Sequence, residues 1–590
     1  MFQTFTSSAS PEQGPPRLAA LRQQIRNEGL AGFLVPRADV HQGEYVAARD
    51  DRLAWLTGFT GSAGFCVVLA DQAGVFIDGR YRTQVKAQVA LDHFTPVPWP
   101  DVLPGPWIMD RTHGEIGFDP WLHTQDDISK LREAGVTLRP VANLVDRIWS
   151  DQPAPPQGLA FLHPDALAGR TSQQKREDLA KDLKGKAAII TLPDSVCWLL
   201  NIRGADVPRN PVLHAFAILH DDARVDLFTD PAKIPAEVLD HLGPQVSLHA
   251  PTAFTAALRA LKGPVQLDPA TAPLALRLTL EEEGTKILGL DDPCRLPKAC
   301  KSGAEIAGMR EAHLRDAAAV IEFLAWLDRE APKGHLTEIA VVTALEGYRR
   351  ATNALHDISF DTICGAGPNG AMMHYRVTED TDRPVGRNEL LLVDSGAQYA
   401  DGTTDITRTM AIGDPGNEAR DAYTCVVQGL INLSRVRWPK GLAGRDLDPI
   451  ARFHLWLDGR DFNHGTGHGV GAFLSVHEGP QRISRISEVP LQAGMILSNE
   501  PGYYREGAFG IRLENLIVVE PAPPGADDRD QLRFETLTFV PFDRRLILSA
   551  RLAPDERDWL DAYHAQVLER VGPRLSDAAR EWLVTAAAPL

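Results

Sequence analysis

The chain has 590 residues, of which 44% are apolar and 24% are charged, and its formal net charge at pH 7 is −17. A chain of this length exceeds a single hydrophobic core and predicts three or four domains. The acidic balance, without any cluster of lysine and arginine, argues against a surface that binds nucleic acid.

Cysteine usage and hydropathy indicate the expected compartment. The six cysteines are scattered without a CxxC motif, which is typical of a protein in a reducing environment. The N-terminus lacks a basic segment followed by an apolar one, so no signal peptide is predicted. No apolar run reaches the roughly 18 residues of a membrane span. We therefore expect a cytoplasmic protein without a membrane partner.

The first half of the chain predicts two similar α/β domains. Residues 17–29 have helical apolar spacing, and AGFLVP, GFCVVLA and GVFIDG read as buried strands. A second series follows in AAIITL, HAFAILH, RVDLFT and VQLD. RLAWL and SVCWL align around Trp55 and Trp198, which favours a domain duplication over chance similarity. With the proline-rich stretch 151–158 as a linker, the predicted domains are 1–150 and 151–295.

The predicted third domain covers residues 296–590. A long amphipathic helix is expected over 302–330, with Ser302 and Glu305 spaced as a capping box. A second helix is expected in HLTEIAVVTALEGYRRAT. After Asp357 the pattern predicts short strands and glycine-rich turns until about residue 546, and two helices end the chain. The fold class is therefore mixed α/β, with an α+β third domain.

Residues 390–515 hold most side chains with an evident chemical use. Their oxygen and imidazole ligands suit Mn²⁺, Zn²⁺ or Co²⁺. Gathered in one place, the carboxylates would repel one another unless cations lay between them. If they meet, the site has enough ligands for two metal ions. The candidate ligands are Asp394, Asp405, His468, Glu500 and Glu514.

The stretch LLLVDSGAQYADGTTDITRT predicts two strands joined by a turn at Asp401 and Gly402. Asp394 and Asp405 would then lie on neighbouring strands, but not directly opposite each other. A bend at Gly396 or a bulge is needed to bring them together. Asp401 is better explained as a turn residue than as a ligand.

The stretch HGTGHGVG carries two histidines among four glycines, which makes a helix improbable. In an extended chain, His464 and His468 face the same way about 13 Å apart, so they cannot bind one metal together. One is then a ligand and the other lines the pocket; a core histidine bonded to backbone is the alternative. In SNEPGYYREGAFGIRLEN, a strand, a glycine-rich loop and a second strand bring Glu500 and Glu514 close.

Two other kinds of functional site are less favoured by the sequence. Gly365, Gly367 and Gly370 have GxGxxG spacing, but the residues that follow lack the helix that a nucleotide site requires. We interpret this segment as a turn that presents His374. GxSxG is absent, so nucleophilic catalysis by serine is not favoured.

Taken together, the motifs resemble those of the metallopeptidases with the "pita-bread" fold. The resemblance covers nearly the whole chain and is strongest to aminopeptidase P of the three-domain cytosolic kind. It implies two creatinase-like N-terminal domains and a pita-bread catalytic domain with a C-terminal helical extension. The motifs that carry it are VHQGEYV, LTGFTGSAG, FIDGRY, CWLLNIRGADVPRNPV, DSGAQY, DGTTDITRT, HGTGHGVG, VHEGP, EPGYY and GIRLEN.

The resemblance assigns roles to residues. The five candidate ligands match the family's metal ligands, and all are intact, unlike in creatinase, which shares the fold without metal. His374, His464 and His477 match its substrate and proton-handling histidines. Tyr504 and Arg512 match further active-site positions that bind substrate. The family's general base falls on Glu500.

The implied activity is removal of the first residue from a peptide with proline in the second position. The implied cofactor is a pair of divalent ions, with Mn²⁺ as the family's usual metal and Zn²⁺ or Co²⁺ as alternatives. Prolidase, which prefers dipeptides, is the alternative enzyme, and a metal-free peptide-binding module is the alternative outside enzymes. A homodimer is expected, and the two N-terminal domains would roof the cleft or form the dimer interface.

Overall fold

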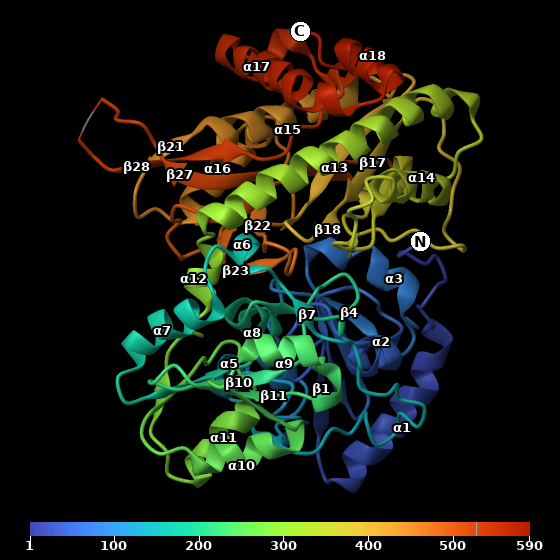
Figure 1. Cartoon of the computed structure of the whole chain (residues 1–590). Helices are drawn as coiled ribbons and strands as arrows, with labels where there is room; N and C mark the ends of the chain where they lie inside the picture. The colour runs from blue at the N-terminus through green and yellow to red at the C-terminus, as the bar shows by residue number, and fades with distance from the viewer. Residues whose placement is uncertain (527) are drawn as a thin grey trace. The chain divides into compact units, whose positions relative to one another are not determined.

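The computed structural model describes residues 1–526 and 528–590. The chain forms two compact units, one of residues 8–295 and one of residues 1–7 with 296–590. We call the first the N-terminal unit and the second, after the motifs predicted to be catalytic, the catalytic unit, and describe each by itself (Figure 1). The predicted boundaries near residues 150 and 295 stay predictions. Among the described residues, no helix is both long and apolar enough to cross a membrane.

The N-terminal unit contains two six-stranded sheets with the same topology. In each, the first strand in sequence lies between an antiparallel and a parallel neighbour. The first sheet has the order β4 (Thr95–Pro98), β3 (Ala73–Ile77), β2 (Phe65–Leu69), β1 (Gly32–Pro36), β5 (Ile116–Phe118) and β6 (Leu138–Pro140). The second has the order β12 (Val246–His249), β11 (Val225–Phe228), β10 (Phe216–Leu219), β8 (Ala187–Ile190), β13 (Val265–Leu267) and β14 (Ile287–Gly289).

The duplication predicted from the two tryptophans is confirmed. Trp55 lies in α2 (Arg52–Thr57) and Trp198 in α8 (Pro193–Leu200), each on the helix after the first strand of its sheet. The predicted helix at 17–29 is α1 (Gly14–Asn27). Other helices of this unit are α3 (Gln84–Gln88), α4 (Pro104–Met109), α5 (Gln125–Glu133), α6 (Asp165–Ala168), α7 (Ser172–Leu183), α9 (Ala236–Leu242), α10 (Phe254–Ala260) and α11 (Leu274–Glu282).

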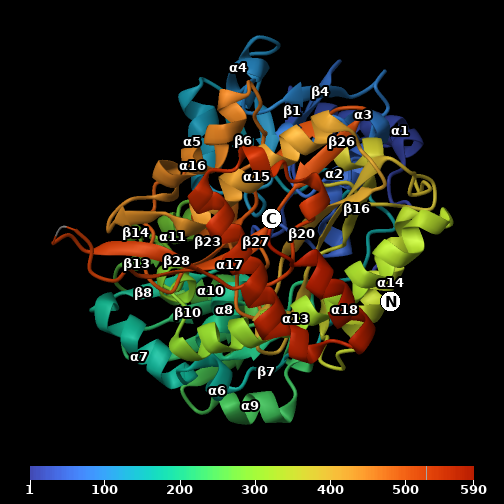
Figure 2. The same cartoon turned by 90° about the horizontal axis from the view of Figure 1, so that it is seen from above.

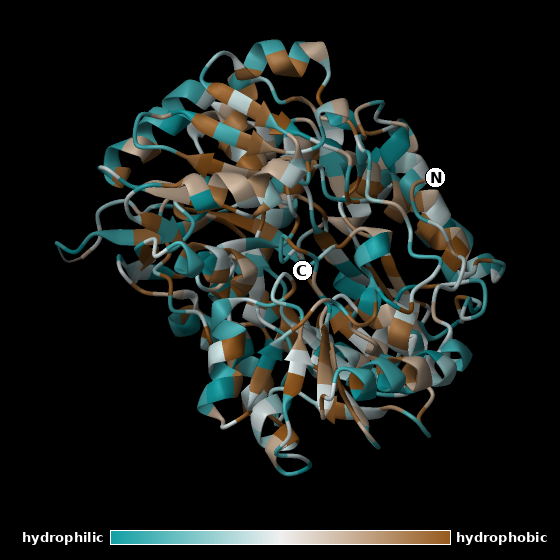
Figure 3. Cartoon of the chain, turned by 90° about the horizontal axis from the view of Figure 1, so that it is seen from below, coloured by the Kyte–Doolittle hydropathy of each residue, from teal (hydrophilic) through white to brown (hydrophobic). Residues whose placement is uncertain are grey.

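Two helices open the catalytic unit as predicted. The long helix is α13 (Gly303–Glu330), and the Ser302 hydroxyl accepts from the Glu305 backbone N–H in a complete capping box. The second is α14 (Glu338–Arg350). Helices in Figure 3 alternate between teal and brown along their length, as expected when one face of each packs on a core.

Three antiparallel sheets follow α14. The first contains β16 (Ile363–Ala366), β17 (Glu389–Ser395) and β20 (Ile406–Ile412), and the second β15 (Asp357–Ile358), β18 (Ala397–Tyr399) and β19 (Gly402–Thr403). The third has the order β21 (Arg437–Pro439), β28 (Gln531–Thr536), β27 (Asn515–Pro521), β24 (Ile496–Asn499), β22 (Gly467–Gly469) and β23 (Glu478–Ile483). A separate hairpin joins β25 (Gly502–Arg505) to β26 (Phe509–Arg512).

The prediction that residues 357–546 contain only strands and turns is wrong. Two helices lie there, α15 (Asn417–Arg435) and α16 (Gly444–Leu457). Pro449 is inside α16, where sequence rules place a helix end, but burial against α15 maintains the helix. A Cβ on Gly429 of α15 would lie 2.1 Å from the Ala451 carbonyl oxygen, so glycine allows this close crossing.

The two C-terminal helices form as predicted, as α17 (Pro554–Val571) and α18 (Asp577–Ala586). They pack on α13 and α15, and Figures 1 and 2 both show the red C-terminal helices beside α13. The C-terminal extension is therefore part of the packing of the catalytic unit.

Candidate metal centre

Asp394 and Asp405 come from the antiparallel pair β17 and β20. Asp394 pairs with Thr407, and Asp405 directly precedes β20. The chain leaves the sheet at Gly396, where a Cβ would lie 2.1 Å from both the Ser359 hydroxyl and the Thr404 carbonyl oxygen. Of the two predicted alternatives, the change of sheet at Gly396 between β17 and β18 favours a bend, since the register of β17 with β20 is regular and without a bulge.

Glu500 and Glu514 flank the last residue pair of β24 and β27, in which Asn499 lies opposite Asn515. The expectation of a simple glycine-rich loop between these strands is wrong, because the hairpin β25–β26 fills that segment. The hairpin projects Tyr504 and Arg512 from the same chain segment that carries both glutamates. The two carboxylates still come close, because the strands on either side of the hairpin pair with each other.

His468 lies between the two pairs of carboxylates. Its Nε2 is 3.4 Å from Asp405 Oδ2 and 3.5 Å from Glu500 Oε1. Its Nδ1 is 3.0 Å from the Gly469 carbonyl oxygen, which fixes the ring and turns Nε2 toward the carboxylates. Ligand atoms of Asp405, His468 and Glu514 all lie within 4.8 Å of one another. Residues 467–469 of the glycine-rich motif form strand β22 and the rest of the motif is not helical, in agreement with the prediction against a helix.

The second histidine of the motif has a different partner. His464 Nε2 is 2.9 Å from the Tyr504 hydroxyl, and Arg512 Nη1 donates to that hydroxyl at 2.7 Å. Arg512 Nη2 also donates to Asp394 Oδ2 at 2.6 Å. A continuous set of hydrogen bonds thus connects His464 through Tyr504 and Arg512 to Asp394. His464 thus bonds to Tyr504, whereas His468 contacts the carboxylates of Asp405 and Glu500.

The remaining predicted histidines lie on two loops. The His477 ring packs edge-on against the His468 ring, with centroids 4.2 Å apart. His374 is half-buried in a turn after the 3₁₀ segment Gly367–Ala371, which packs on β26. The GxGxxG segment thus forms a short turn rather than the start of an α-helix.

Burial and repulsion dominate the electrostatics of the centre. Asp394, Asp405 and Glu514 are buried. Burial, and then the neighbouring carboxylates, raise the pKa of Asp405 and Glu514 well above their usual values and also raise the pKa of Glu500. Arg512 offsets only one of the four negative charges.

Three buried oxygens in this centre have no hydrogen-bond partner among the described residues: Asp394 Oδ1, Asp405 Oδ1 and Glu514 Oε1. Buried carboxylate oxygens are normally satisfied by donors or by cations. Oxygen and imidazole donors in this arrangement fit divalent ions such as Mn²⁺, Zn²⁺ or Co²⁺. The residues present therefore fit the implied cofactor.

Sequence reasoning missed the residues that hold the ligands in place. The Thr407 hydroxyl donates to Glu514 Oε2 at 2.8 Å, and the Ser498 hydroxyl donates to Glu500 Oε1 at 3.1 Å. Ser498 Oγ also accepts from the His468 backbone N–H at 2.9 Å. The only sequence signal was the placement of hydroxyl residues at alternate positions beside the carboxylates, in DITRT and SNE.

Arg408 was also missed. It is buried and lies next to Thr407 on β20. Its guanidinium connects the ligand strands to the C-terminal extension, because its acceptors are Thr407 O, Glu514 O, Asn515 Oδ1, Val540 O, Pro541 O and the Tyr563 hydroxyl.

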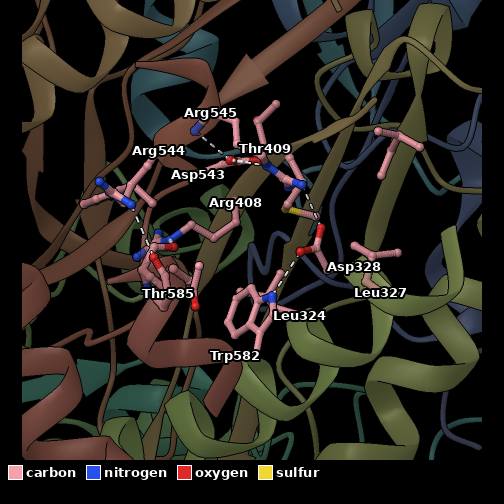
Figure 4. Close-up of a pocket in the computed structure, with 15 residues that line it drawn as sticks. Leu324, Leu327, Asp328, Arg408, Thr409, Asp543, Arg544, Arg545, Trp582 and Thr585 are labelled. Carbon is pink, nitrogen blue, oxygen red and sulfur yellow. Dashed lines mark hydrogen bonds and ion pairs between the residues drawn. The ribbon is translucent and has the colours of Figure 1, made fainter. Parts of the chain in front are cut away.

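A separate cavity of about 190 Å³ lies between β20, α13 and α18 (Figure 4). Arg545 at its edge forms ion pairs with Asp328 and Asp543, and the Trp582 indole donates to Asp328. None of the ten predicted site residues, all of which the structure describes, lines this cavity. It belongs to the packing of the C-terminal extension rather than to the metal centre.

Comparison with known families covers the chain in four segments. Residues 307–521 match metallopeptidase family M24, and residues 530–590 match the C-terminal region of peptidase M24. Residues 17–148 and 151–305 each match a creatinase/prolidase N-terminal domain. The two matches in the first half agree with the duplicated sheets.

Full-length relatives are also similar. The chain is 37% identical to a probable Xaa-Pro aminopeptidase P of Coccidioides posadasii, over 99% of this chain and 95% of that protein. It is 37% identical to aminopeptidase P2 of Arabidopsis thaliana, over 97% of this chain and 88% of that protein. The crystal structure of an X-prolyl aminopeptidase from Caenorhabditis elegans, described as a cytosolic enzyme with a di-nuclear active site, superposes with a TM-score of 0.93 and 34% identity, covering 98% of this chain and all of that one.

The charge of the centre predicts a pH dependence of metal binding. Because burial raises the pKa of Asp405, Glu500 and Glu514, protons compete with metal at a higher pH than at an ordinary carboxylate. Titration calorimetry with Mn²⁺ from about pH 5 to 8 should show affinity rising with pH and protons released on binding.

Matched aspartate variants provide the control for this titration. Asp405→Asn should weaken binding and reduce proton release, whereas Asp401→Asn, in the turn where Asp401 pairs with Arg315, should leave both unchanged. If the wild-type protein binds Mn²⁺ with equal affinity at all pH values and without proton release, the conclusion that burial raises the pKa of these carboxylates is contradicted.

Proposed function

Because this chain belongs to metallopeptidase family M24 and to its Xaa-Pro aminopeptidase P group, we propose that it releases the N-terminal residue from peptides with proline in the second position. The observation that carries this proposal is a metal centre in which ligand atoms of Asp405, His468 and Glu514 lie within 4.8 Å of one another, in a chain that resembles aminopeptidase P over nearly its whole length. A metal-free binding module would be expected to have lost ligands, and none is lost here.

The centre suits two divalent ions, and we propose Mn²⁺ as the metal. Asp394, Asp405, His468, Glu500 and Glu514 would hold the ions, and ligand atoms of Asp405, His468 and Glu514 already lie within 4.8 Å of one another. Arg512 supports the inclusion of Asp394, because its hydrogen bond to Asp394 Oδ2 leaves the buried Oδ1 without a hydrogen-bond partner among the described residues.

The protein's own groups orient the reactants and move protons. When bound, divalent ions polarise a carbonyl and lower the pKa of a coordinated water to near neutrality. Glu500, oriented by the Ser498 hydroxyl, would accept the proton of the attacking water. His477 and His374 would hold the oxyanion and the departing proline nitrogen. The substrate amine would bind near Asp394, which would restrict cleavage to the first residue.

His464, Tyr504 and Arg512 form a hydrogen-bonded set that ends on Asp394. Burial raises the pKa of Tyr504 to about 12, so its hydroxyl is protonated at neutral pH and can donate. Arg512 donates to the same hydroxyl oxygen, so the Tyr504 proton is left to point toward His464 Nε2. We propose that these three residues position the substrate and stabilise Asp394 as an anion.

A homodimer and a cytoplasmic location complete the proposal. On α16, Phe453, Trp456 and Leu457 are 53%, 43% and 72% exposed, and such an apolar group is typical of a covered surface. Light scattering should give the mass of two chains, and Trp456→Glu should give the mass of one; a wild-type monomer would contradict the proposal.

The scattered free cysteines support the proposed cytoplasmic location, because they are typical of proteins in a reducing compartment.

Peptide hydrolysis with controlled metal tests the function. Protein stripped with a chelator should be inactive on an Xaa-Pro-Xaa tripeptide, and added Mn²⁺ should restore release of the first residue. The Asp405→Asn variant is the control, since it should stay inactive at the same metal concentration.

The dipeptide Xaa-Pro separates the alternatives. Cleavage of the dipeptide but not of the tripeptide would identify a prolidase. Metal binding without cleavage of either peptide would favour the binding module.

Two neighbouring tyrosines on β25 test the role of this hydrogen-bonded set. Tyr504→Phe removes the hydroxyl between His464 and Arg512, and kcat should fall about 10- to 100-fold, since a hydrogen bond to a charged group contributes about 1.5–3 kcal/mol. Tyr503→Phe is the matched control, because the Tyr503 ring packs on Phe509 and should leave kcat unchanged. Equal kcat values for the two variants would remove Tyr504 from the mechanism.

A further inference from the structure

A buried ion cluster lies directly behind the predicted catalytic histidine. Glu478, the residue after His477, contacts two lysines whose side chains are almost completely buried. Lys298 Nζ lies 2.9 Å from Glu478 Oε2, and Lys301 Nζ contacts Glu478 Oε1. We propose that Glu478, held by these two lysines, is a positioning residue that sets the place of the His477 ring against His468.

The cost of burying this cluster indicates a specific role. All three residues are buried, with exposed fractions of 5%, 2% and 6% for Glu478, Lys298 and Lys301. Burial by itself would raise the pKa of Glu478, but the two ammonium groups lower it, so the carboxylate is charged. A protein with apolar side chains of similar volume in place of a buried ion pair is often equally stable or more stable. A contribution to the stability of the fold therefore does not by itself explain the cluster.

The strand geometry connects this cluster to the metal centre. Glu478 begins β23, and His477 is the bend residue directly before it, so anchoring Glu478 fixes the peptide from which His477 projects. Glu478 pairs with Gly469, next to His468, and the register shifts between His468 and Gly469. A Cβ on Gly469 would lie 2.4 Å from the Glu478 carbonyl oxygen, so the two backbones are in close contact. Glu478 thus holds both histidine-bearing segments.

The lysines come from the segment that begins the main part of the catalytic unit. Lys298 lies in α12 (Arg295–Ala299), and Lys301 precedes Ser302, the N-cap of α13. The segment is fixed to the catalytic sheet, since the Lys301 backbone N–H donates to Gly494 O and Cys300 bridges to Met495. The chain passes from the N-terminal unit to the catalytic unit at residues 295–296. The start of the catalytic unit therefore supplies the anchor for His477.

This inference rests on the proposed function only for the catalytic role of His477. The orientation of the His477 ring can be measured without any enzyme activity. Without the Lys301 contact, the His477 ring should change its orientation against His468. We expect kcat on the tripeptide to fall about 10- to 100-fold, as for other residues that orient metal-site groups, with KM nearly unchanged.

The test compares three variants with the wild type. Glu478→Gln removes the anion, and Lys301→Met removes one cation while leaving a neutral Lys298–Glu478 pair that should fold. Glu556→Gln is the matched control: Glu556 is 3% exposed and is held by Gln428 and Asn432, far along the chain from His477. For each, the thermal midpoint, kcat, KM and the pH profile of kcat/KM are measured with Mn²⁺.

Imidazole NMR of ¹⁵N-histidine-labelled, metal-free protein gives a readout independent of activity, with the His477 signals assigned from a His477→Asn variant. Lys301→Met should shift the His477 signals, lower kcat and move the acidic limb of the pH profile; Glu556→Gln should lower only the thermal midpoint. Unmoved His477 signals and an unchanged kcat in Lys301→Met would overturn the proposal. If the wild type cleaves no Xaa-Pro peptide, the proposed function fails, and the NMR comparison still decides the positioning role.

Discussion

Burial of several carboxylates in one small volume is the constraint on which the catalytic unit depends. The pKa values of Asp405, Glu500 and Glu514 are raised because burial removes water and the neighbouring carboxylates repel. Arg512 alone does not balance these charges. Oxygens left without hydrogen bonds among the described residues point to cations as the missing partners. The same arrangement that destabilises the metal-free protein provides the affinity for metal.

The architecture brings these groups together by pairing strands whose ends carry them. β17 with β20 supplies two aspartates, and β24 with β27 flanks two glutamates, while β22 places His468 between the pairs. Hydroxyls of Thr407 and Ser498 orient the carboxylates, and Arg408 fastens the same strands to the C-terminal extension. The precision of the centre therefore depends on residues that bind neither metal nor substrate.

Sequence patterns predicted those features of the fold and the site that depend on local spacing and residue type. The duplicated α/β domains, the capping box at Ser302 and the bend at Gly396 followed from local spacing and residue type. The metal ligands were recognisable as a group, since four carboxylates and a histidine recur within short motifs, although their individual roles stay proposals. Helix α16 was not predicted because Pro449 lies inside it, where packing against α15 maintains the helix. Helix α15 contains no proline, and its helical apolar spacing was present in the sequence. Glu478 could not be linked to Lys301 from the sequence, because the two residues are 177 positions apart.

The most direct test of this account is the thermal stability of the metal-free protein and of Asp405→Asn at pH 7. A carboxylate whose pKa is raised by folding stabilises the fold at low pH, and this stability is lost as the pH rises through the folded pKa. At neutral pH, removing the charge should therefore make the metal-free variant more stable than the metal-free wild type. Added Mn²⁺ should reverse the order by stabilising the wild type far more. A metal-free wild type as stable as the variant, and unaffected by Mn²⁺, would contradict the account.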